Sequence, residues 1–477
     1  MLRISRIALL TALLAVLVPT AASAADRMPI GFQDDPTFRW IEGAPAQLDR
    51  VQEAGATILR ATADWRAIAP TRPARATNPF DKAYNLNDLD DMIRNAQMRG
   101  IQVMLTIWGT PKWANGGNEP NVAPRRVADL QNFARALADR YSGRHAGYPY
   151  VGRFSIWNEP NLQIFLSPQF NAKGKIVSPA TYAKLYKAGY AGIKQGNKKA
   201  LVAIGETSNQ GRDHPSKGNI GDSVAPGTFA KLLGGFKGLR FDAYAEHPYA
   251  TRPNLSPSQR VRFPNVTLTQ LKHFEEMLDV WFKRKNVPVW ITEYGYETKP
   301  GEPAGVTNAQ QARYMSQVIR QLKADPRVHI FIWFIFKDSP QSLWQSGLFS
   351  GSGAMKPAYR TFSALAPTVA GETLSIAANR APSITVAVPR LAAVTPAGGN
   401  IGVTYRVYSG TKLITVDQAA PPLASTASIT FTANFTPVAG TTYRLEIDAN
   451  DPSGNHALWT YSLVTAGGKA TPAKKKK

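Results

Sequence analysis

The stretch Phe154-Ser155-Ile156-Trp157-Asn158-Glu159-Pro160-Asn161 begins with a mostly apolar run, which is followed by the glutamate Glu159. A second stretch, Val289-Trp290-Ile291-Thr292-Glu293-Tyr294-Gly295, follows the same plan. Each run is typical of a buried β-strand that carries a single glutamate at its end. Because burial disfavours the charged form of a carboxyl group, an acid in such a place is costly unless it is paired or used. The two stretches therefore indicate a fold of buried strands and a site where those strands end.

Further apolar runs flank these two stretches, and segments of helical periodicity separate them. The eight strand-like runs are Met28–Phe32, Ala56–Ala61, Ile101–Trp108, Val151–Trp157, Ala200–Gly205, Phe241–His247, Val287–Glu293 and Val328–Phe336. Several are continuously apolar, as expected when both faces of a parallel sheet are buried. This alternation predicts an α/β fold, a (β/α)8 TIM barrel, over residues 25–368. A doubly wound open sheet is the alternative, but no glycine-rich phosphate loop follows the first run.

The sequence changes character after the last of these runs. Residues 371–466 lose the helical pattern and consist of short strand-like runs separated by Gly, Pro and Asn-Asp turns. This pattern predicts a small all-β sandwich of immunoglobulin-like size, which we interpret as an accessory domain.

Both ends of the chain are typical of segments outside a folded domain. Residues 1–24 combine Arg3 and Arg6 with an apolar run and a closing Ala22-Ser23-Ala24, which is the pattern of a cleaved signal peptide. The apolar run is shorter than the roughly 20 residues that cross a bilayer, and an uncleaved anchor is the alternative. We expect a secreted or periplasmic protein without a transmembrane segment. Residues 467–477 contain five lysines and predict a basic disordered tail.

The composition excludes several kinds of chemistry. The 477 residues contain no cysteine, which excludes disulfides, thiolate metal sites and a cysteine nucleophile. The six histidines lack metal-binding spacing, and no Gly-x-Ser-x-Gly or dinucleotide motif occurs, so we expect neither metal nor cofactor. The net charge of +23 favours anionic partners such as an acidic polysaccharide. Because dense basic blocks with interleaved aromatic residues are missing, the sequence argues against nucleic acid.

The two glutamates point to one reaction. In a TIM barrel the ends of the strands meet at one rim, so Glu159 and Glu293 are expected to face the same cleft. Two carboxyl groups across a cleft are the minimum apparatus for cutting a glycosidic bond, since one donates a proton while the other attacks.

The motif Trp157-Asn158-Glu159-Pro160 resembles the acid/base motif of the retaining glycoside hydrolases with (β/α)8 barrels, such as cellulases and xylosidases. That clan carries its acid/base glutamate after strand four and its nucleophile after strand seven. The resemblance implies that Glu159 is the general acid and base, and that Glu293 is the nucleophile. It also implies that Asn158 binds the sugar 2-hydroxyl.

Three further residues match the clan more weakly. Arg60 ends the second run and resembles the arginine that keeps the nucleophile ionised, with a rim salt bridge as the alternative. His247 and Tyr249 resemble a His-x-Tyr element in which the tyrosine hydroxyl bonds to the nucleophile and the histidine lies near the substrate. Packing within the loop is the alternative for this pair. Glu206 ends the fifth run, where a structural partner for a neighbouring base is favoured over a substrate contact.

Sugar sites also need flat apolar platforms, because pyranose rings present C–H faces to aromatic rings. Four tryptophans after strands three and eight are candidates: Trp108, Trp113, Trp333 and Trp344. Each could equally belong to the core.

Together these features predict an exported retaining glycoside hydrolase that cleaves an oligo- or polysaccharide, most simply a β-glycosidase. The alternatives are a catalytically inactive carbohydrate-binding protein, similar to a lectin or adhesin, and a transglycosylase that uses the same residues.

Overall fold

A computed structural model describes residues 28–99, 101–219, 221–340, 344–366, 371–388, 398–410, 412–424, 428–450 and 456–465. The predicted signal peptide and lysine tail lie outside these residues. None of the helices in the described ranges is long and apolar enough to cross a membrane.

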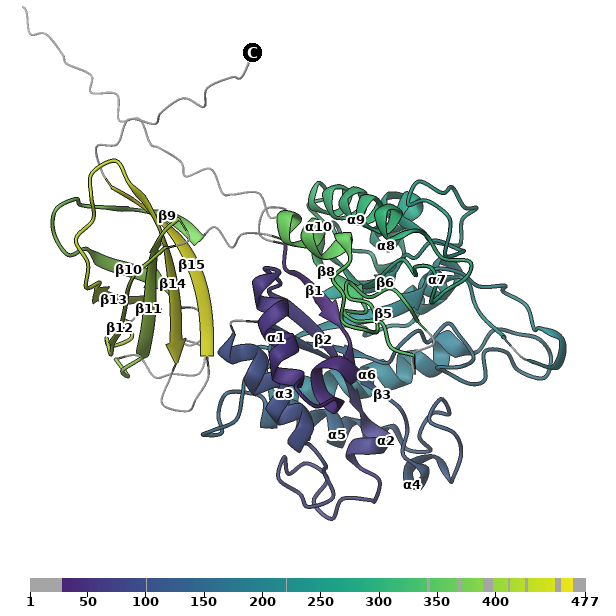
Figure 1. Cartoon of the computed structure of the whole chain (residues 1–477). Coiled ribbons are helices and arrows are strands. Elements are labelled where there is room, and N and C mark those ends of the chain that lie inside the picture. The colour runs from purple at the N-terminus through teal and green to yellow at the C-terminus, as the bar shows by residue number, and fades with distance from the viewer. Residues whose placement is uncertain are drawn as a thin grey trace, which may run out of the picture.

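The first part of the chain forms a closed barrel of eight parallel strands (Figure 1). The strands are β1 (Ile30–Gln33), β2 (Ile58–Asp64), β3 (Gln102–Trp108), β4 (Arg153–Ile156), β5 (Leu201–Ser208), β6 (Ala243–His247), β7 (Val289–Tyr294) and β8 (Val328–Phe334). They pair in chain order, and β8 closes the barrel on β1, with Ile332 opposite Gly31. The predicted TIM barrel is confirmed, and the open sheet is not found.

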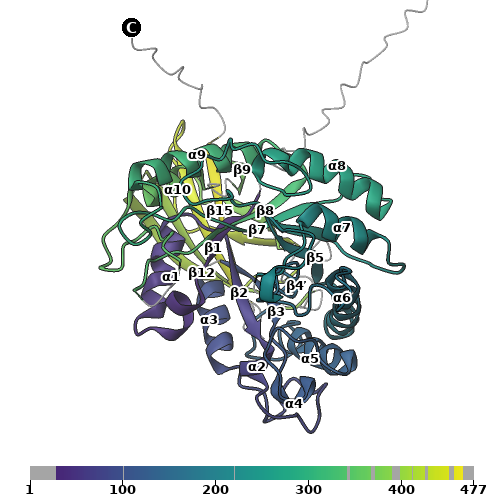
Figure 2. The same cartoon turned by 90° about the vertical axis from the view of Figure 1, so that its right-hand side faces the viewer.

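Helices surround the barrel and cover the outer face of its strands (Figure 2). The longer ones are α1 (Ala44–Glu53), α3 (Asn87–Met98), α5 (Val127–Arg140), α6 (Ser178–Gly196), α7 (Pro226–Gly234), α8 (Leu271–Phe282), α9 (Asn308–Lys323) and α10 (Pro357–Leu365). Single turns are formed by η2 (Pro36–Trp40), α2 (Trp65–Ile68), α4 (Lys112–Asn115), η3 (Lys217–Asn219) and η4 (Leu268–Gln270).

Helix α9 illustrates how the sequence produces these elements. The side chain of Thr307 accepts from the backbone N–H of Gln310, whose own side chain bonds back to Thr307, so a capping box fixes the start of the helix. Met315, Ile319 and Leu322 recur at helical spacing and are buried against the barrel.

The interior of the barrel consists of two successive layers. The first, here called the apolar layer, contains Ile58, Met104, Ala203, Ala243, Ala245, Trp290, Ile330 and Ile332. Side chains alternate along a strand, so the next interior position lies two residues further on. On most strands the side chains beyond the apolar layer are polar or charged, and we call them the charged layer: Gln33, Arg60, Thr106, Ser155, Glu206, His247 and Thr292. On β8 the residue two positions beyond Ile332 is instead the apolar Phe334.

Glu206 enters the charged layer through an irregularity of β5. The pairing of β5 with β6 shifts by one residue between Gly205 and Thr207, and both Gly205 and Glu206 have positive φ, at 102° and 54°. Because an extra residue reverses which face the following side chains occupy, the shift turns Glu206 into the barrel.

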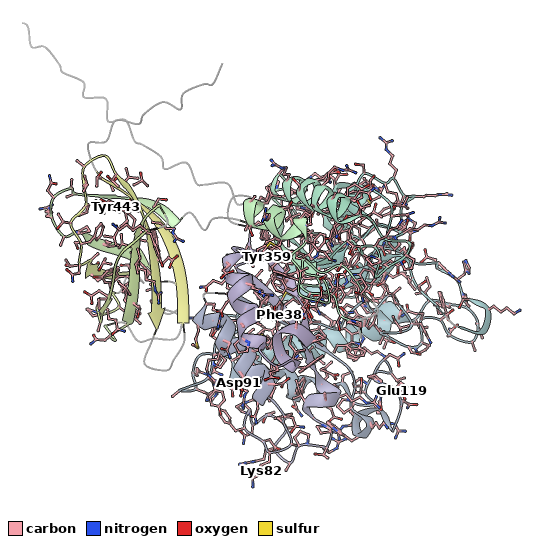
Figure 3. The ribbon with its side chains drawn as sticks, in the orientation of Figure 1. Phe38, Lys82, Asp91, Glu119, Tyr359 and Tyr443 are labelled. Carbon is pink, nitrogen blue, oxygen red and sulfur yellow. The ribbon has the colours of Figure 1, made fainter. Side chains whose placement is uncertain are left out.

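The C-terminal part is a small β domain with its own core. Its strands are β9 (Gly371–Ile376), β10 (Ser383–Ala387), β11 (Gly402–Ser409), β12 (Lys412–Ala419), β13 (Ser428–Thr432), β14 (Thr442–Asn450) and β15 (His456–Thr465). A five-stranded sheet in the order β12-β11-β14-β15-β9 accompanies the pair β10-β13. The pairing is antiparallel except between β15 and β9, so the sheet is mixed. Tyr443 belongs to this core, apart from the barrel residues Phe38 and Tyr359 (Figure 3).

Candidate active site

Glu159 and Glu293 follow β4 and end β7 at the same rim of the barrel. One carboxylate oxygen of each, together with a ring nitrogen of His247, lies within 4.8 Å of the other two atoms. Both glutamates line a cleft of about 750 Å³. The sequence prediction that two remote acids meet across an opening therefore matches the geometry.

Arg60 holds several of these groups together from beneath. Its guanidinium is buried and donates to Glu293 and Gln33, to Thr106 at 2.8 Å, to Asn158 at 2.8 Å and to Glu206 at 3.1 Å. Burial opposes the charge, but Glu206 and Glu293 together raise the pKa of Arg60. A permanent cation thus lies against Glu293, as the resemblance implied.

His247 lies behind Glu159 and does not itself line the cleft. Its Nδ1 is 3.0 Å from Glu159 Oε1, and its Nε2 is 2.8 Å from Glu206 Oε2 and 3.1 Å from the Thr292 hydroxyl. Burial alone would lower its pKa, but Glu293, Glu159 and Glu206 raise the pKa of His247 to about 10. The ring is therefore an imidazolium at neutral pH and donates from both nitrogens. The sequence placed His247 near the substrate, but Glu159 and not His247 lines the cleft.

Glu206 is a fully buried carboxylate that joins the two cations. Burial would raise its pKa, but Arg60 and His247 lower the pKa of Glu206 to about 2. Thr292 donates to the same oxygen at 2.8 Å. Glu206 contacts Arg60 and His247 rather than the cleft, which agrees with the structural role favoured from the sequence.

Tyr249 completes the surroundings of Glu293. Its hydroxyl donates to Glu293 Oε2 at 3.2 Å, and burial together with Glu293 and Glu159 raises its pKa well above the usual value. The phenol therefore stays neutral and keeps its proton to donate. Arg60 and Tyr249 thus bond to different oxygens of Glu293.

A metal ion does not suit this arrangement. Glu159, His247 and Glu293 offer the one group of three ligand atoms close enough to bind an ion within the described ranges. A protonated imidazole cannot ligate, however, and the guanidinium of Arg60 bonded to Glu293 repels a second cation. The donor set fits proton transfer and nucleophilic attack.

Two of the four predicted tryptophan platforms lie at the cleft. Trp108 and Trp344 line it, and Trp344 contacts the ring of Tyr249 edge-on with centroids 5.4 Å apart. Trp108 donates from its indole nitrogen to the Phe165 carbonyl at 3.3 Å.

The other two tryptophans lie elsewhere, and their prediction as platforms is wrong. Trp333 is fully buried, because it alternates with the interior residue Ile332 and so faces the helices. The next residue, Phe334, lines the cleft instead. Trp113 packs edge-on against Trp65, with centroids 5.8 Å apart, and donates to a backbone carbonyl outside the cleft.

The sequence interpretation missed several residues of the cleft. Gln33 ends β1 and contacts Arg60, and its position at a strand end was the available signal. Leu162, Ile164 and Phe165 also line the cleft from the loop after β4, and Ile164 is 65% exposed. No pattern in an irregular loop distinguishes such residues before folding.

Comparison with solved structures supports the barrel. A family 39 glycoside hydrolase from Bacteroides cellulosilyticus WH2 aligns with a TM-score of 0.51 and 18% identity, over 86% of this chain and 80% of that chain. The GH5_18 protein from Streptomyces cattleya, solved in complex with GlcNAc, gives a TM-score of 0.52 and 17% identity, over 73% of this chain and 84% of that chain. At such identities the likeness shows the fold alone. No curated protein matches the sequence.

A family model supplies the identification that the structures alone do not. The model described as Cellulase (glycosyl hydrolase family 5) matches residues 24–337, a range that contains both glutamates and well over half of the chain. The resemblance inferred from the motifs is confirmed, and this chain belongs to glycosyl hydrolase family 5.

Proposed function

We propose that this glycoside hydrolase is exported and cleaves β-glycosidic bonds of an oligo- or polysaccharide with retention of configuration. The observation that carries the proposal is the approach of Glu159 and Glu293 to within 4.8 Å. Retaining enzymes hold their carboxyl groups about 5–5.5 Å apart, whereas inverting enzymes need about 6.5–9.5 Å to admit a water molecule. The short separation favours direct attack on the sugar.

The surroundings of the two glutamates support different roles. Glu293 accepts from Arg60 and Tyr249, two donors that stabilise a carboxylate and suit a nucleophile. Glu159 accepts from His247 through Oε1 only, so its Oε2 is available to carry a proton toward the substrate.

In the proposed mechanism Glu293 attacks the anomeric carbon while Glu159 protonates the departing oxygen. Glu159 then removes a proton from water, which releases the sugar from Glu293. Asn158 lines the cleft with its side-chain oxygen fixed by Arg60, and it is in place to bind a sugar hydroxyl. The pattern of residues 1–24 supports export through the secretory route.

Trapping of the covalent intermediate tests the mechanism. A panel of activated 2-deoxy-2-fluoro β-glycosides should inactivate the enzyme and add one glycosyl group to the peptide that contains Glu293. Glu293→Gln should prevent labelling. Glu159→Ala should slow hydrolysis of natural glycans by about 10⁴-fold, since it removes both acid and base catalysis. Azide should restore turnover of aryl glycosides by Glu159→Ala and give a β-glycosyl azide.

The matched control is Glu119→Gln, a change at an exposed glutamate of the loop after β3 (Figure 3). It should leave labelling and turnover unchanged. Equal, small turnover of wild type and Glu159→Ala on every glycan would instead identify a carbohydrate-binding protein. Longer products in the presence of acceptor sugars would identify a transglycosylase.

A further inference from the structure

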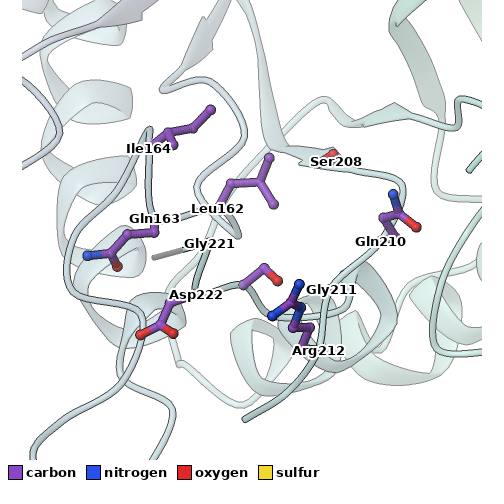
Figure 4. Close-up of a pocket in the computed structure, with 10 residues that line it drawn as sticks. Leu162, Gln163, Ile164, Ser208, Gln210, Gly211, Arg212, Gly221 and Asp222 are labelled. Carbon is purple, nitrogen blue, oxygen red and sulfur yellow. The ribbon is translucent and has the colours of Figure 1, made fainter. Parts of the chain in front are cut away.

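A second pocket, of about 410 Å³, is lined by the loops that follow β4 and β5 (Figure 4). The pocket and the cleft share Leu162, Ile164, Ser208 and Gln210, so the two adjoin along these residues, and we call them together the depression. Both volumes fall within the range of about 300–1,000 Å³ that is typical of small-molecule sites. A glycan chain held at the glutamates can therefore extend into the second pocket.

The loops around this pocket carry an excess of positive charge. We call residues 161–177, 209–225 and 248–266, which follow β4, β5 and β6, the basic loops. They contain seven basic residues against two acidic ones, a net charge of 7 − 2 = +5. The basic residues are Lys173, Lys175, Arg212, Lys217, Arg252, Arg260 and Arg262, all of them exposed.

Within the described part of the chain, the basic side chains of these loops form no ion pairs. Asp213 accepts from the Ala225 backbone and the Thr228 hydroxyl, and Asp222 accepts from the backbone and hydroxyl of Ser216. Neither acid forms an ion pair with any of the seven basic side chains, and none of these seven has an ion pair with a described residue.

The opposite part of the rim is different. The loops after β7 and β8, residues 295–307 and 335–356, contain three acidic and three basic residues. One of these pairs, Lys356 with Asp338, forms an ion pair at 2.5 Å. The basic loops therefore carry a larger excess of positive charge than the loops after β7 and β8.

Two of the seven cations line the depression itself. Arg212 lines the second pocket, and Arg252 lines the catalytic cleft. A guanidinium binds carboxylate or sulfate oxygens through two parallel hydrogen bonds, which a neutral sugar cannot match. Because the walls of a depression focus the field of such charges, an anionic chain is attracted to this side in particular.

Resting on the function proposed above, we infer that the substrate is an anionic polysaccharide whose acidic sugars bind Arg212 and Arg252. We assign the carboxylate of a uronic acid as the group that binds these arginines. Sulfate is the other anion that the same guanidinium groups accept.

Matched polymers test this inference. Glucuronoxylan, alginate, polygalacturonate, hyaluronan and xanthan are each compared with the same polymer after carboxyl reduction, which removes the charge and keeps the backbone. Binding is measured with Glu159→Ala, and turnover with otherwise unchanged enzyme. At least one acidic polymer should bind about tenfold more tightly than its reduced form at low salt, and the advantage should shrink as salt rises.

Arg212→Gln and Arg252→Gln should each remove about tenfold of this preference by weakening the binding of the acidic polymer, whereas the affinity for the reduced polymer should change by less than twofold. The matched control is Arg135→Gln, at an exposed arginine on α5. It should change neither quantity. If carrageenan, a sulfated polymer, binds more tightly than every uronate polymer, the group that Arg212 and Arg252 recognise would be sulfate and not carboxylate.

The inference is overturned if acidic and reduced polymers bind with equal affinity, or if no acidic polymer binds. Turnover of aryl glycosides in the same experiment would still support the hydrolase function. Absence of turnover on all substrates, with acidic polymers still bound through Arg212 and Arg252, overturns the hydrolase function instead.

Discussion

The apolar layer and the charged layer lie one interior position apart in the same barrel, yet different forces hold them. The apolar layer excludes water, and its contribution scales with the hydrocarbon area that it buries. The charged layer buries Arg60, His247 and Glu206, whose desolvation is compensated by the ion pairs that Glu206 forms with both cations and by further bonds to the catalytic glutamates. The difference indicates that the first layer stabilises the fold, whereas the second fixes the positions of Glu159 and Glu293.

The largest effect is expected from Glu206→Gln, which leaves Arg60 and His247 without their shared anion. Removing one partner of a buried ion pair costs about 3–5 kcal/mol, and misplacing the catalytic groups should lower kcat by about 10²-fold or more. Because Glu206 is one of the three carboxylates that raise the pKa of His247, with Glu293 and Glu159, the alkaline loss of stability should also begin at a lower pH in this variant.

Rate measurements from pH 5 to 10, with denaturant unfolding at each pH, check this expectation. Glu119→Gln again serves as the control. An unchanged pH profile together with a lower stability would limit Glu206 to a purely structural role.

A smaller and different effect is expected from Ile332→Ala in the apolar layer. Truncation of a fully buried isoleucine should reduce the free energy of unfolding by about 2–4 kcal/mol. Since Ile332 belongs to the apolar layer and bears no polar side-chain atom, kcat at 25 °C should stay within about threefold of wild type. A large loss of kcat in folded Ile332→Ala would show that the two layers are not separable.

The smallest effect on the free energy of unfolding is expected from a change of one pH unit. The pKa of His247 is about 10 in the folded state and about 6.5 when unfolded, so its contribution to stability is complete below pH 6.5. As pH rises toward 10 that contribution is lost, by at most about 1.4 kcal/mol per pH unit. Glu206 acts in the opposite direction, because its pKa is lowered to about 2 and its contribution is lost as pH falls from about 4.5 toward 2.

Unfolding of wild type and His247→Gln between pH 6 and 10 measures this dependence. The stability difference between the two should shrink as pH rises, whereas Ile332→Ala should follow the wild-type slope. A constant difference between wild type and His247→Gln would mean that the imidazole is neutral in the folded protein.

Much of the fold could be predicted because the barrel strands are long apolar runs at regular intervals. The pairing of Arg60 and Tyr249 with Glu293 was also within reach, since each lies at or after a strand end and matches a motif of a known clan, whereas the bond of Arg60 to Asn158 was not predicted. These predictions depended on the order of the strands and not on fine geometry.

What could not be predicted depended on which face a side chain occupies. In a continuously apolar strand such as β8 no alternation of polarity marks the interior, so Trp333 was assigned to the cleft in place of its neighbour Phe334. The interior position of Glu206 depends on a shift of pairing that leaves no signal in the sequence. Residues 161–177 form an irregular loop, and the pocket wall that they build arises only with the tertiary fold.

The backbone at the rim has one further consequence. Trp157, Glu159 and Glu206 all adopt positive φ, at 74°, 36° and 54°, although none is glycine. The carboxyl groups of Glu159 and Glu206 are consequently directed by the main chain at the ends of β4 and β5 more than by the loops that continue from those strands. Changes farther along these two loops can therefore alter which glycan is preferred without moving either carboxyl group.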